Sequence, residues 1–165
     1  MTPSTSAGPH FAVGSAIFGE IKPADVAFVA AQGFPAMELY RSGFSAEFLQ
    51  RPQGFKDLLD QHGLRMITCS NGGPGMSTNF IDPAKKAQTI ADHIAFARDV
   101  LSLFGCQHFK MNMGSRPPKG TSISDLQAIA STLNELGRAT LDMGIKLSPI
   151  RISGGLSSGS TRFAS

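Results

Sequence analysis

Four glycines recur along the chain, and each closes a helix-like stretch that is followed within a residue or two by a strand-like run. They are Gly33, Gly63, Gly105 and Gly144. Glycine suits the position after a helix because it enters the left-handed conformation without a Cβ penalty. A strand, a helix, a glycine and another strand, repeated, are typical of parallel βα units. The sequence therefore predicts an α/β fold.

The strand-like runs share a short, mostly apolar character and start directly after these glycines. They are FPAMELYR from Phe34, LRMITCSNG from Leu64, CQHFKMNMG from Cys106 and IKLSP from Ile145, with FAVGSAIFG from Phe11 as the first strand. Helix starts are marked by Pro23, by Asp82 followed by proline, and by a capping-box pattern at Ser122 and Asp125. We count four βα units and a fifth strand.

The length fits an incomplete barrel. A full (βα)₈ barrel needs about 250 residues, and this chain has 165. The expected fold is a partial (βα)₈ TIM barrel with a parallel sheet over residues 11–149. Residues 1–10 are expected to be a disordered N-terminus, and residues 150–165, which show no helix, carboxylate or apolar period, a disordered tail.

Charge and composition exclude several classes of function. The formal net charge is +3, but the tail holds Arg151 and Arg162 and no acidic residue, so the rest of the chain is nearly neutral. We therefore expect no nucleic-acid partner. No apolar run approaches the length of about 20 residues that spans a membrane, and the N-terminus lacks the features of a secretion signal. Cys69 and Cys106 have no metal-site spacing. A cytoplasmic protein is expected.

Alternate residues of the strands separate into an apolar and a polar set. The apolar set, including Met37, Leu39, Ile67, Cys69, Phe109, Met111 and Leu147, is expected to face the helices. The polar set would line the axis and mouth of the barrel, where βα-barrel chemistry takes place. It includes Tyr40, Thr68, His108, Lys146 and Ser148, and four candidate substrate-binding residues: Glu38, Ser70, Lys110 and Asn112.

The polar residues also have structural interpretations. Glu38 fits an ion pair with Lys146 or Lys110 inside the barrel as well as it fits substrate contact. His108 is expected to be a core histidine, whereas His10, His62 and His93 are expected at the surface. The glycine-rich segment SNGGPGMSTN from Ser70 lacks the phosphate-loop pattern, so we interpret it as a flexible loop at the mouth.

Three segments carry a resemblance to a known family: GFPAMELYR, GCQHFKMNMG and LNELGRATLDMGIKLSP. Over residues 11–149 the chain resembles the sugar phosphate isomerase/epimerase family with the xylose isomerase-like TIM barrel. The resemblance implies that a sugar, sugar phosphate or inositol-derived ketose is isomerised, epimerised or dehydrated. It also implies a divalent cation (Mn, Mg, Co or Zn) held by two Glu, an Asp and a His, all from the fifth strand onward. This chain is therefore expected to hold no metal and no catalytic residue.

The resemblance stops after Pro149. In the family the fifth strand runs into a His-x-His segment followed by a metal-binding Glu, which this chain lacks. A single-nucleotide frameshift near the Pro149 codon accounts for the break. Read one base out of frame, the tail's codons permit HPHIWGPLEREHEIR, which contains His-x-His and a glutamate six residues later. The codons permit this string without forcing it, since each His position also allows Asn, Asp or Tyr.

Three functional hypotheses follow. The first is a truncated isomerase/epimerase-like protein that binds a small-molecule sugar or sugar phosphate and is inactive alone. The second is a non-catalytic barrel fragment that self-associates through its open strand edges. The third is a protein similar to abasic-site endonucleases, a class that places zinc-binding histidines at the ends of the third and fourth strands. Here those regions hold Ser70, Asn71 and Asn112, which disfavours the third hypothesis.

Overall fold

The computed structural model describes residues 11–72, 79–114 and 119–150. The expected disorder of residues 1–10 and 151–165 concerns segments outside this part of the chain, as does most of the glycine-rich loop after Ser70. Ile150, which the sequence assigned to the tail, is instead the last residue of the fifth strand.

A five-stranded parallel sheet forms the centre of the fold, with the strands adjacent in chain order. The strands are β1 (Val13–Gly14), β2 (Ala36–Tyr40), β3 (Arg65–Ser70), β4 (His108–Asn112) and β5 (Lys146–Ile150). In a (βα)₈ barrel each strand likewise lies beside the strand that precedes it in the chain, so the predicted partial (βα)₈ barrel is confirmed.

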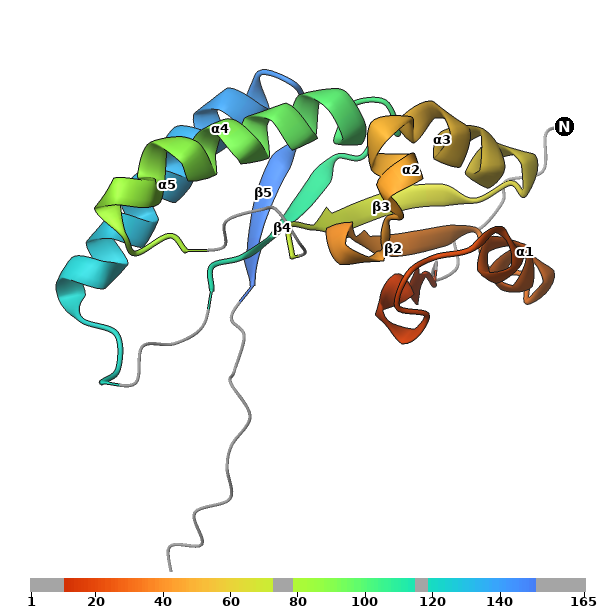
Figure 1. The fold of residues 1–165 in the computed structure, drawn as a ribbon, viewed down its shortest axis with the longest axis horizontal. Coiled ribbons are helices and arrows are strands. Elements are labelled where there is room, and N and C mark those ends of the chain that lie inside the picture. Colours follow the sequence, from red (N-terminus) through yellow and green to blue (C-terminus); the bar gives the residue numbers. More distant parts are fainter. Residues whose placement is uncertain (1–10, 73–78, 115–118, 151–165) are drawn as a thin grey trace, which may run out of the picture.

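Helices connect the strands. The α-helices are α1 (Pro23–Ala31), α2 (Ala46–Gln50), α3 (Pro52–Gln61), α4 (Lys86–Phe96) and α5 (Ile123–Leu141). Shorter turns are η1 (Ser15–Ile17), η2 (Arg41–Gly43), η3 (Pro83–Lys85) and the π-helical η4 (Ala97–Leu101), which prolongs α4. Figure 1 shows α3, α4 and α5 on one side of β3, β4 and β5, whose other side carries no helix among the described residues.

The local signals in the sequence act as predicted. The four glycines after the helices all have positive φ, from 63° at Gly105 to 80° at Gly33. Ser122 accepts a hydrogen bond from the Asp125 N–H, and Asp125 accepts one from the Ser122 N–H, so the capping box of α5 is formed. The start of α5 and the four glycine-ended helices therefore lie where the sequence signals placed them.

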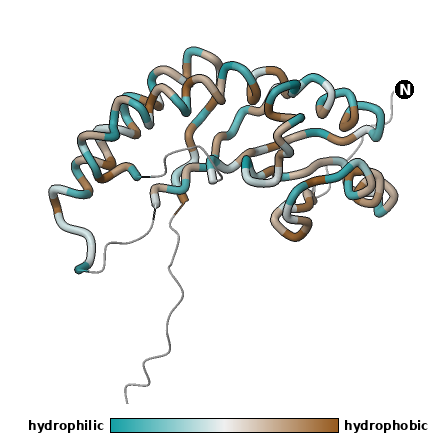
Figure 2. Tube along the Cα trace, in the orientation of Figure 1, coloured by the Kyte–Doolittle hydropathy of each residue, from teal (hydrophilic) through white to brown (hydrophobic). Residues whose placement is uncertain are grey.

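The core lies between the sheet and the helices. Met37, Leu39, Phe109 and Met111 are fully buried there, as expected for the apolar set. Phe44 packs edge to face against Phe55 of α3 and against Phe96 of α4, with ring centroids 5.3 and 6.4 Å apart. Figure 2 shows hydrophilic and hydrophobic residues alternating along the helices, consistent with one buried side each. The opposite face of the sheet is left to the polar set.

Two strands differ from the expectation. The first is only two residues long, because the chain turns into η1 at Ser15, whose hydroxyl accepts a hydrogen bond from the Tyr40 N–H at 3.1 Å in place of a backbone partner. In β3 the register shifts, so that Met37 lies opposite Met66 but Glu38 lies opposite Thr68. Ile67 is the extra residue, and it is 42% exposed instead of packed against the helices.

Candidate functional site

The four candidate binding residues lie in three neighbouring strands, toward the carboxyl end of the sheet. Ser70 is the last residue of β3, opposite Tyr40 of β2 on one side and Lys110 of β4 on the other. Glu38 precedes Tyr40 by two residues, and Asn112 ends β4. Because side chains two residues apart share a face of a strand, the sheet brings these groups together on its open face.

Glu38 and Lys110 form an ion pair across β3, from Nζ to Oε1, and each side chain is 23% exposed. Of the two partners considered for Glu38, the structure therefore selects Lys110. Lys146 begins β5, opposite His108, at the other end of the strands. The ammonium group of Lys110 also lies 5.6 Å from the centroid of the Tyr40 ring, a distance typical of a cation–π contact.

Two groups of this cluster, Lys110 and Tyr40, have raised pKa values. The hydrogen bond with Glu38 raises the pKa of Lys110. Burial, and then the negative charge of Glu38, raise the pKa of the Tyr40 phenol. A carboxylate, an ammonium and a neutral phenol thus share the open face of the sheet. Together they can donate and accept hydrogen bonds with the hydroxyl groups of a ligand.

Ser70 and Asn112 are placed differently from this cluster. Ser70 is only 3% exposed, between Tyr40 of β2 and Lys110 of β4. The Asn112 side-chain Oδ1 accepts a hydrogen bond from the Gly114 N–H at 3.0 Å, which stabilises the turn after β4. Glu38 and Lys110 are brought into contact, whereas Ser70 and Asn112 flank them. Ligand binding by these four residues stays a prediction.

Two histidines are not where the sequence placed them. His93 was expected at the surface but is fully buried, with its Nε2 2.8 Å from the Asn71 Nδ2. Its spacing from Ile90 and Ala97, three and four residues away, was the signal that it lies on the apolar side of α4. His108 was expected in the core but is exposed, because it begins β4, and the described ladder with β3 pairs only the residues after it.

Charged and polar groups behind the site are unusually buried. Burial lowers the pKa of His93 to about 4, and the positive charge of Arg41 acts in the same direction. Arg41 follows Tyr40, and its guanidinium carbon lies 5.1 Å from the centre of the Phe96 ring. Its Nε and Nη1 are buried without a hydrogen-bond partner in the part of the chain that the structure describes, and desolvation lowers the pKa of Arg41.

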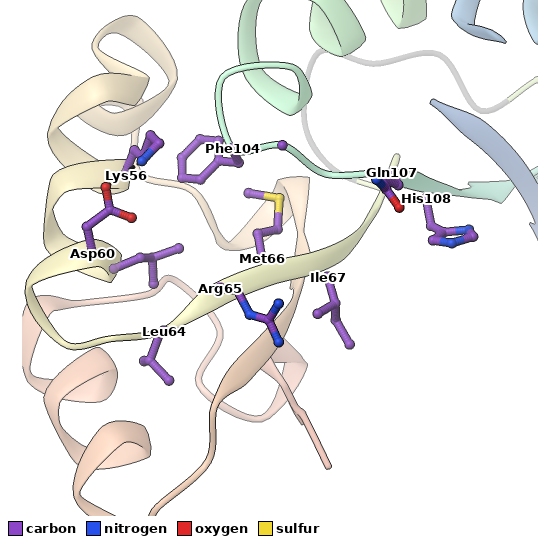
Figure 3. A pocket seen from close by; sticks show the side chains of 11 residues that line it. Lys56, Asp60, Leu64, Arg65, Met66, Ile67, Phe104, Gln107 and His108 are labelled. Atoms are coloured by element: carbon purple, nitrogen blue, oxygen red, sulfur yellow. Dashed lines mark hydrogen bonds and ion pairs between the residues drawn. The ribbon is translucent and has the colours of Figure 1, made fainter. Parts of the chain in front are cut away.

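A separate cavity of about 350 Å³ opens at the other end of the sheet. It is lined by residues of α3, the start of β3 and the segment before β4, where these two strands separate. In Figure 3, Met66 points toward Phe104 on one side of β3, whereas Arg65 and Ile67 point to the opposite side. His108 also lines this cavity. None of the four candidate binding residues does.

The family resemblance implies a divalent metal, which needs several carboxylate or histidine ligands close together. Over residues 11–72, 79–114 and 119–150, no three His, Cys, Asp or Glu side chains are grouped so that they could hold an ion. The Glu38 carboxylate is engaged by Lys110, and His93 is enclosed by Asn71 and two phenylalanine rings. The described residues therefore do not fit a metal centre.

No described helix combines the length and the apolar character that a membrane crossing requires.

Comparison with known proteins identifies the fold. No family model and no curated protein matches the sequence. Among solved structures, the chain is similar to a sugar phosphate isomerase/epimerase from Parabacteroides distasonis, at 14% identity and a TM-score of 0.65, covering 89% of this chain and 52% of the other. It is also similar to a xylose isomerase-like TIM barrel protein from Mycobacterium smegmatis in complex with magnesium, at 17% identity and a TM-score of 0.62. The match covers 85% of this chain and 54% of that protein.

A third similar structure is an AP endonuclease of family 2 from Brucella melitensis, with 16% identity and a TM-score of 0.68. The match covers 86% of this chain and 55% of the endonuclease. Identities this low establish the fold alone. The chain adopts the fold of xylose isomerase-like TIM barrels and spans about half the length of these structures. The resemblance expected from the sequence is thus confirmed in fold.

Proposed function

We propose that this chain forms the sugar-binding wall of a metal-dependent isomerase- or epimerase-like barrel. Its ligand is a sugar or sugar phosphate, whose hydroxyl groups bind at Glu38, Ser70, Lys110 and Asn112. The observation that carries the proposal is the Glu38–Lys110 pair beside Tyr40 on the open, polar face of the sheet. The fold neighbours support the class of reaction, since one is a sugar phosphate isomerase/epimerase.

The chemistry of the pair suits a hydroxylated ligand. A lysine ammonium has three donors, and one of them is used by Glu38. The carboxylate of Glu38 keeps acceptor capacity for a ligand O–H, and the Tyr40 phenol stays protonated. Vicinal hydroxyl groups of a sugar both donate and accept, so they match alternating donors and acceptors of this kind better than an apolar ligand does.

In this proposal the residues of the sheet bind and orient the ligand but do not catalyse its reaction. The Lewis-acid chemistry of that reaction would be supplied by a divalent metal held outside the described residues. Its ligands would come from a segment after β5. The 165-residue chain alone is expected to be inactive.

We propose in addition that a frameshift near Pro149 produced the sequence after β5. The His-x-His string permitted by the alternative frame begins at the last residues of β5, at the carboxyl end of the sheet where barrel active sites lie. The nucleotide sequence across this point tests the idea. Codons downstream that encode an unrelated string, or a stop, in the alternative frame would contradict it.

A binding experiment tests the sugar site directly. Saturation-transfer NMR and titration of the full chain with a ketohexose, a ketose phosphate and an abasic DNA duplex should detect the two sugars. Lys110→Met keeps much of the side-chain volume and removes the charge, and it should weaken sugar binding about tenfold, the worth of one charged hydrogen bond.

Lys146→Met is the matched control, because Lys146 begins β5 at the opposite end of the sheet from the ion pair. This substitution should leave sugar binding unchanged. Equal affinity of wild type and Lys110→Met for the sugars would contradict the proposed site. Binding of the abasic duplex alone would favour the endonuclease hypothesis. Gel filtration of the same samples separates a self-associating fragment from a monomer.

A further inference from the structure

The end of β3 is tied to the end of β4 by a side chain. Asn71, the first residue after β3, is fully buried. Its Oδ1 accepts a hydrogen bond from the Asn112 N–H at 2.6 Å, and its Nδ2 donates to the Asn112 carbonyl oxygen at 3.0 Å. The side-chain amide thus binds both backbone groups of Asn112, as a neighbouring strand would. The Asn71 N–H also donates to the Lys110 carbonyl oxygen at 3.0 Å.

His93 of α4 fixes the orientation of this amide. The His93 Nδ1 lies 2.7 Å from the Thr89 carbonyl oxygen, which can only accept, so Nδ1 carries the proton. Nε2 is therefore an acceptor, and it receives a hydrogen bond from the Asn71 Nδ2 at 2.8 Å. The two hydrogens of the Asn71 amide thus bind the His93 Nε2 and the Asn112 carbonyl oxygen. A flipped amide would place its oxygen against two acceptors, so only one orientation satisfies the network.

Aromatic packing holds the histidine ring in place. The His93 ring lies 5.4 Å from the Phe80 ring in an edge-on arrangement and 5.7 Å from the Phe109 ring. Phe109 belongs to β4, between His108 and Lys110. The chain of contacts therefore runs from the helix layer through His93 and Asn71 to the backbone of β4 at Lys110 and Asn112.

We infer that Asn71 and His93 are positioning residues, which hold the carboxyl end of β4 so that Lys110 keeps its place between Glu38 and the ligand. The inference rests on the proposed sugar site. Both residues are fully buried, so they would act on a ligand only through the β4 backbone and never by contact. Asn71 binds that backbone at Lys110 and Asn112, the two positions in β4 that carry candidate binding side chains.

Substitutions at His93 separate the hydrogen bond from the packing. His93→Phe keeps a ring between Phe80 and Phe109 but removes the acceptor for Asn71. His93→Gln offers an amide oxygen in place of Nε2 and should restore the bond. Asn71→Asp is a second, near-isosteric variant that removes both donors. Thr89→Val is the matched control, since the buried Thr89 hydroxyl has no hydrogen-bond partner among the described residues and the carbonyl that holds His93 stays.

Two measurements are made on each variant. The first is the NMR titration of the Lys110 side chain, which needs no ligand. In His93→Phe and Asn71→Asp the midpoint of this titration should fall toward that of an ordinary lysine, because the ion pair between Lys110 and Glu38 loosens. The second is sugar affinity, which should fall about tenfold, the worth of one hydrogen bond. His93→Gln and Thr89→Val should behave like wild type in both. In a Lys110→Met background, His93→Phe should weaken sugar binding by less than it does in wild type, because only its effect through Asn112 remains.

The outcomes distinguish this inference from the proposed function. If wild type binds no sugar but the Lys110 titration moves in His93→Phe and Asn71→Asp, the sugar site is wrong and the positioning role stands. If Lys110→Met weakens sugar binding while both network variants stay folded and leave affinity and the Lys110 titration unchanged, the positioning role is overturned. Additive losses in the double variant would also overturn it, since they would show that His93 acts independently of Lys110.

Discussion

At the scale of single residues, several ionisable side chains of the candidate site and of the layer behind it are shielded from water. Lys110 and Glu38 share the open face of the sheet, each side chain less than a quarter exposed. Arg41 and His93 lie behind that face, where the lack of water disfavours the charged form of both. The hydrogen bond from the Asn71 Nδ2 to the His93 Nε2 is formed only by the neutral ring, so the protonation state of His93 and the geometry of β4 are linked.

This linkage predicts acid sensitivity. The pKa of His93 is lowered from 6.5 to about 4 in the folded chain, so the unfolded chain takes up the proton first as the pH falls. The stabilisation is complete above about pH 6.5 and is lost progressively toward pH 4. Between pH 7 and pH 5 the loss should be on the order of 2 kcal/mol.

Urea unfolding of wild type and His93→Gln at the two pH values measures this loss. Arg41 and Asp92, the charged groups that act on His93, are present in both proteins, so the difference isolates the histidine. The variant should lose less stability on acidification. Equal losses would show that His93 is protonated in the folded chain without cost.

The two misplaced histidines show what the sequence can and cannot reveal at this scale. His93 was predictable, since its helical spacing from Ile90 and Ala97 places it on the buried side of α4. His108 was not, because strand alternation gives the face of a residue but not its depth. Its exposure depends on the separation of β3 from β4 near their starts, which only the assembled sheet determines. The partnership of Glu38 with Lys110 likewise required the register of three strands.

At the scale of elements, the glycines and caps predicted the helices well because these signals act within a few residues. Alternation in β3 failed at one point for a related reason. The extra residue Ile67 changes which side chains face the helices, and a bulge depends on the partner strand as much as on local sequence. Met66 is consequently 4% exposed and Ile67 42% exposed, the reverse of the simple pattern.

A matched pair of substitutions tests the bulge. Met66→Thr should lower the free energy of unfolding by about 2 to 3 kcal/mol, because it removes buried apolar volume and buries a hydroxyl. Ile67→Thr should cost about 0.5 kcal/mol or less, as expected for a partly exposed position. Chemical denaturation of both variants gives the comparison. A larger cost at Ile67 than at Met66 would contradict the shifted register.

At the scale of the whole molecule, the parallel sheet ends in β1 on one side and β5 on the other. Its polar face corresponds to the inside of a closed barrel, and the chain spans about half the length of the barrels it resembles. Exposed strand edges favour association with other chains, whereas barrel closure removes them. We therefore propose that the 165-residue chain self-associates through its strand edges, and that completion of the barrel abolishes this self-association.

Restoring the alternative reading frame after Pro149 tests that proposal together with the metal site. The restored protein should regain the His-x-His segment and the sequence that follows it, and should elute as a single species. At a hundredfold excess of Mn²⁺ or Mg²⁺ over the dissociation constant, metal bound only by the folded state should stabilise it by about 3 kcal/mol. Melting scans with metal and with chelator measure this as a rise in Tm.

Two controls accompany these scans. Alanine at both histidines of the restored segment should abolish the metal-dependent rise in Tm without restoring self-association. The 165-residue chain should show no rise, because its described residues hold no group of three metal-binding side chains. If instead the 165-residue chain is stabilised by metal, the site lies within this half of the barrel and the proposed division of roles is wrong. A restored protein that ignores metal would equally contradict it, since the histidines would then have no ion to bind.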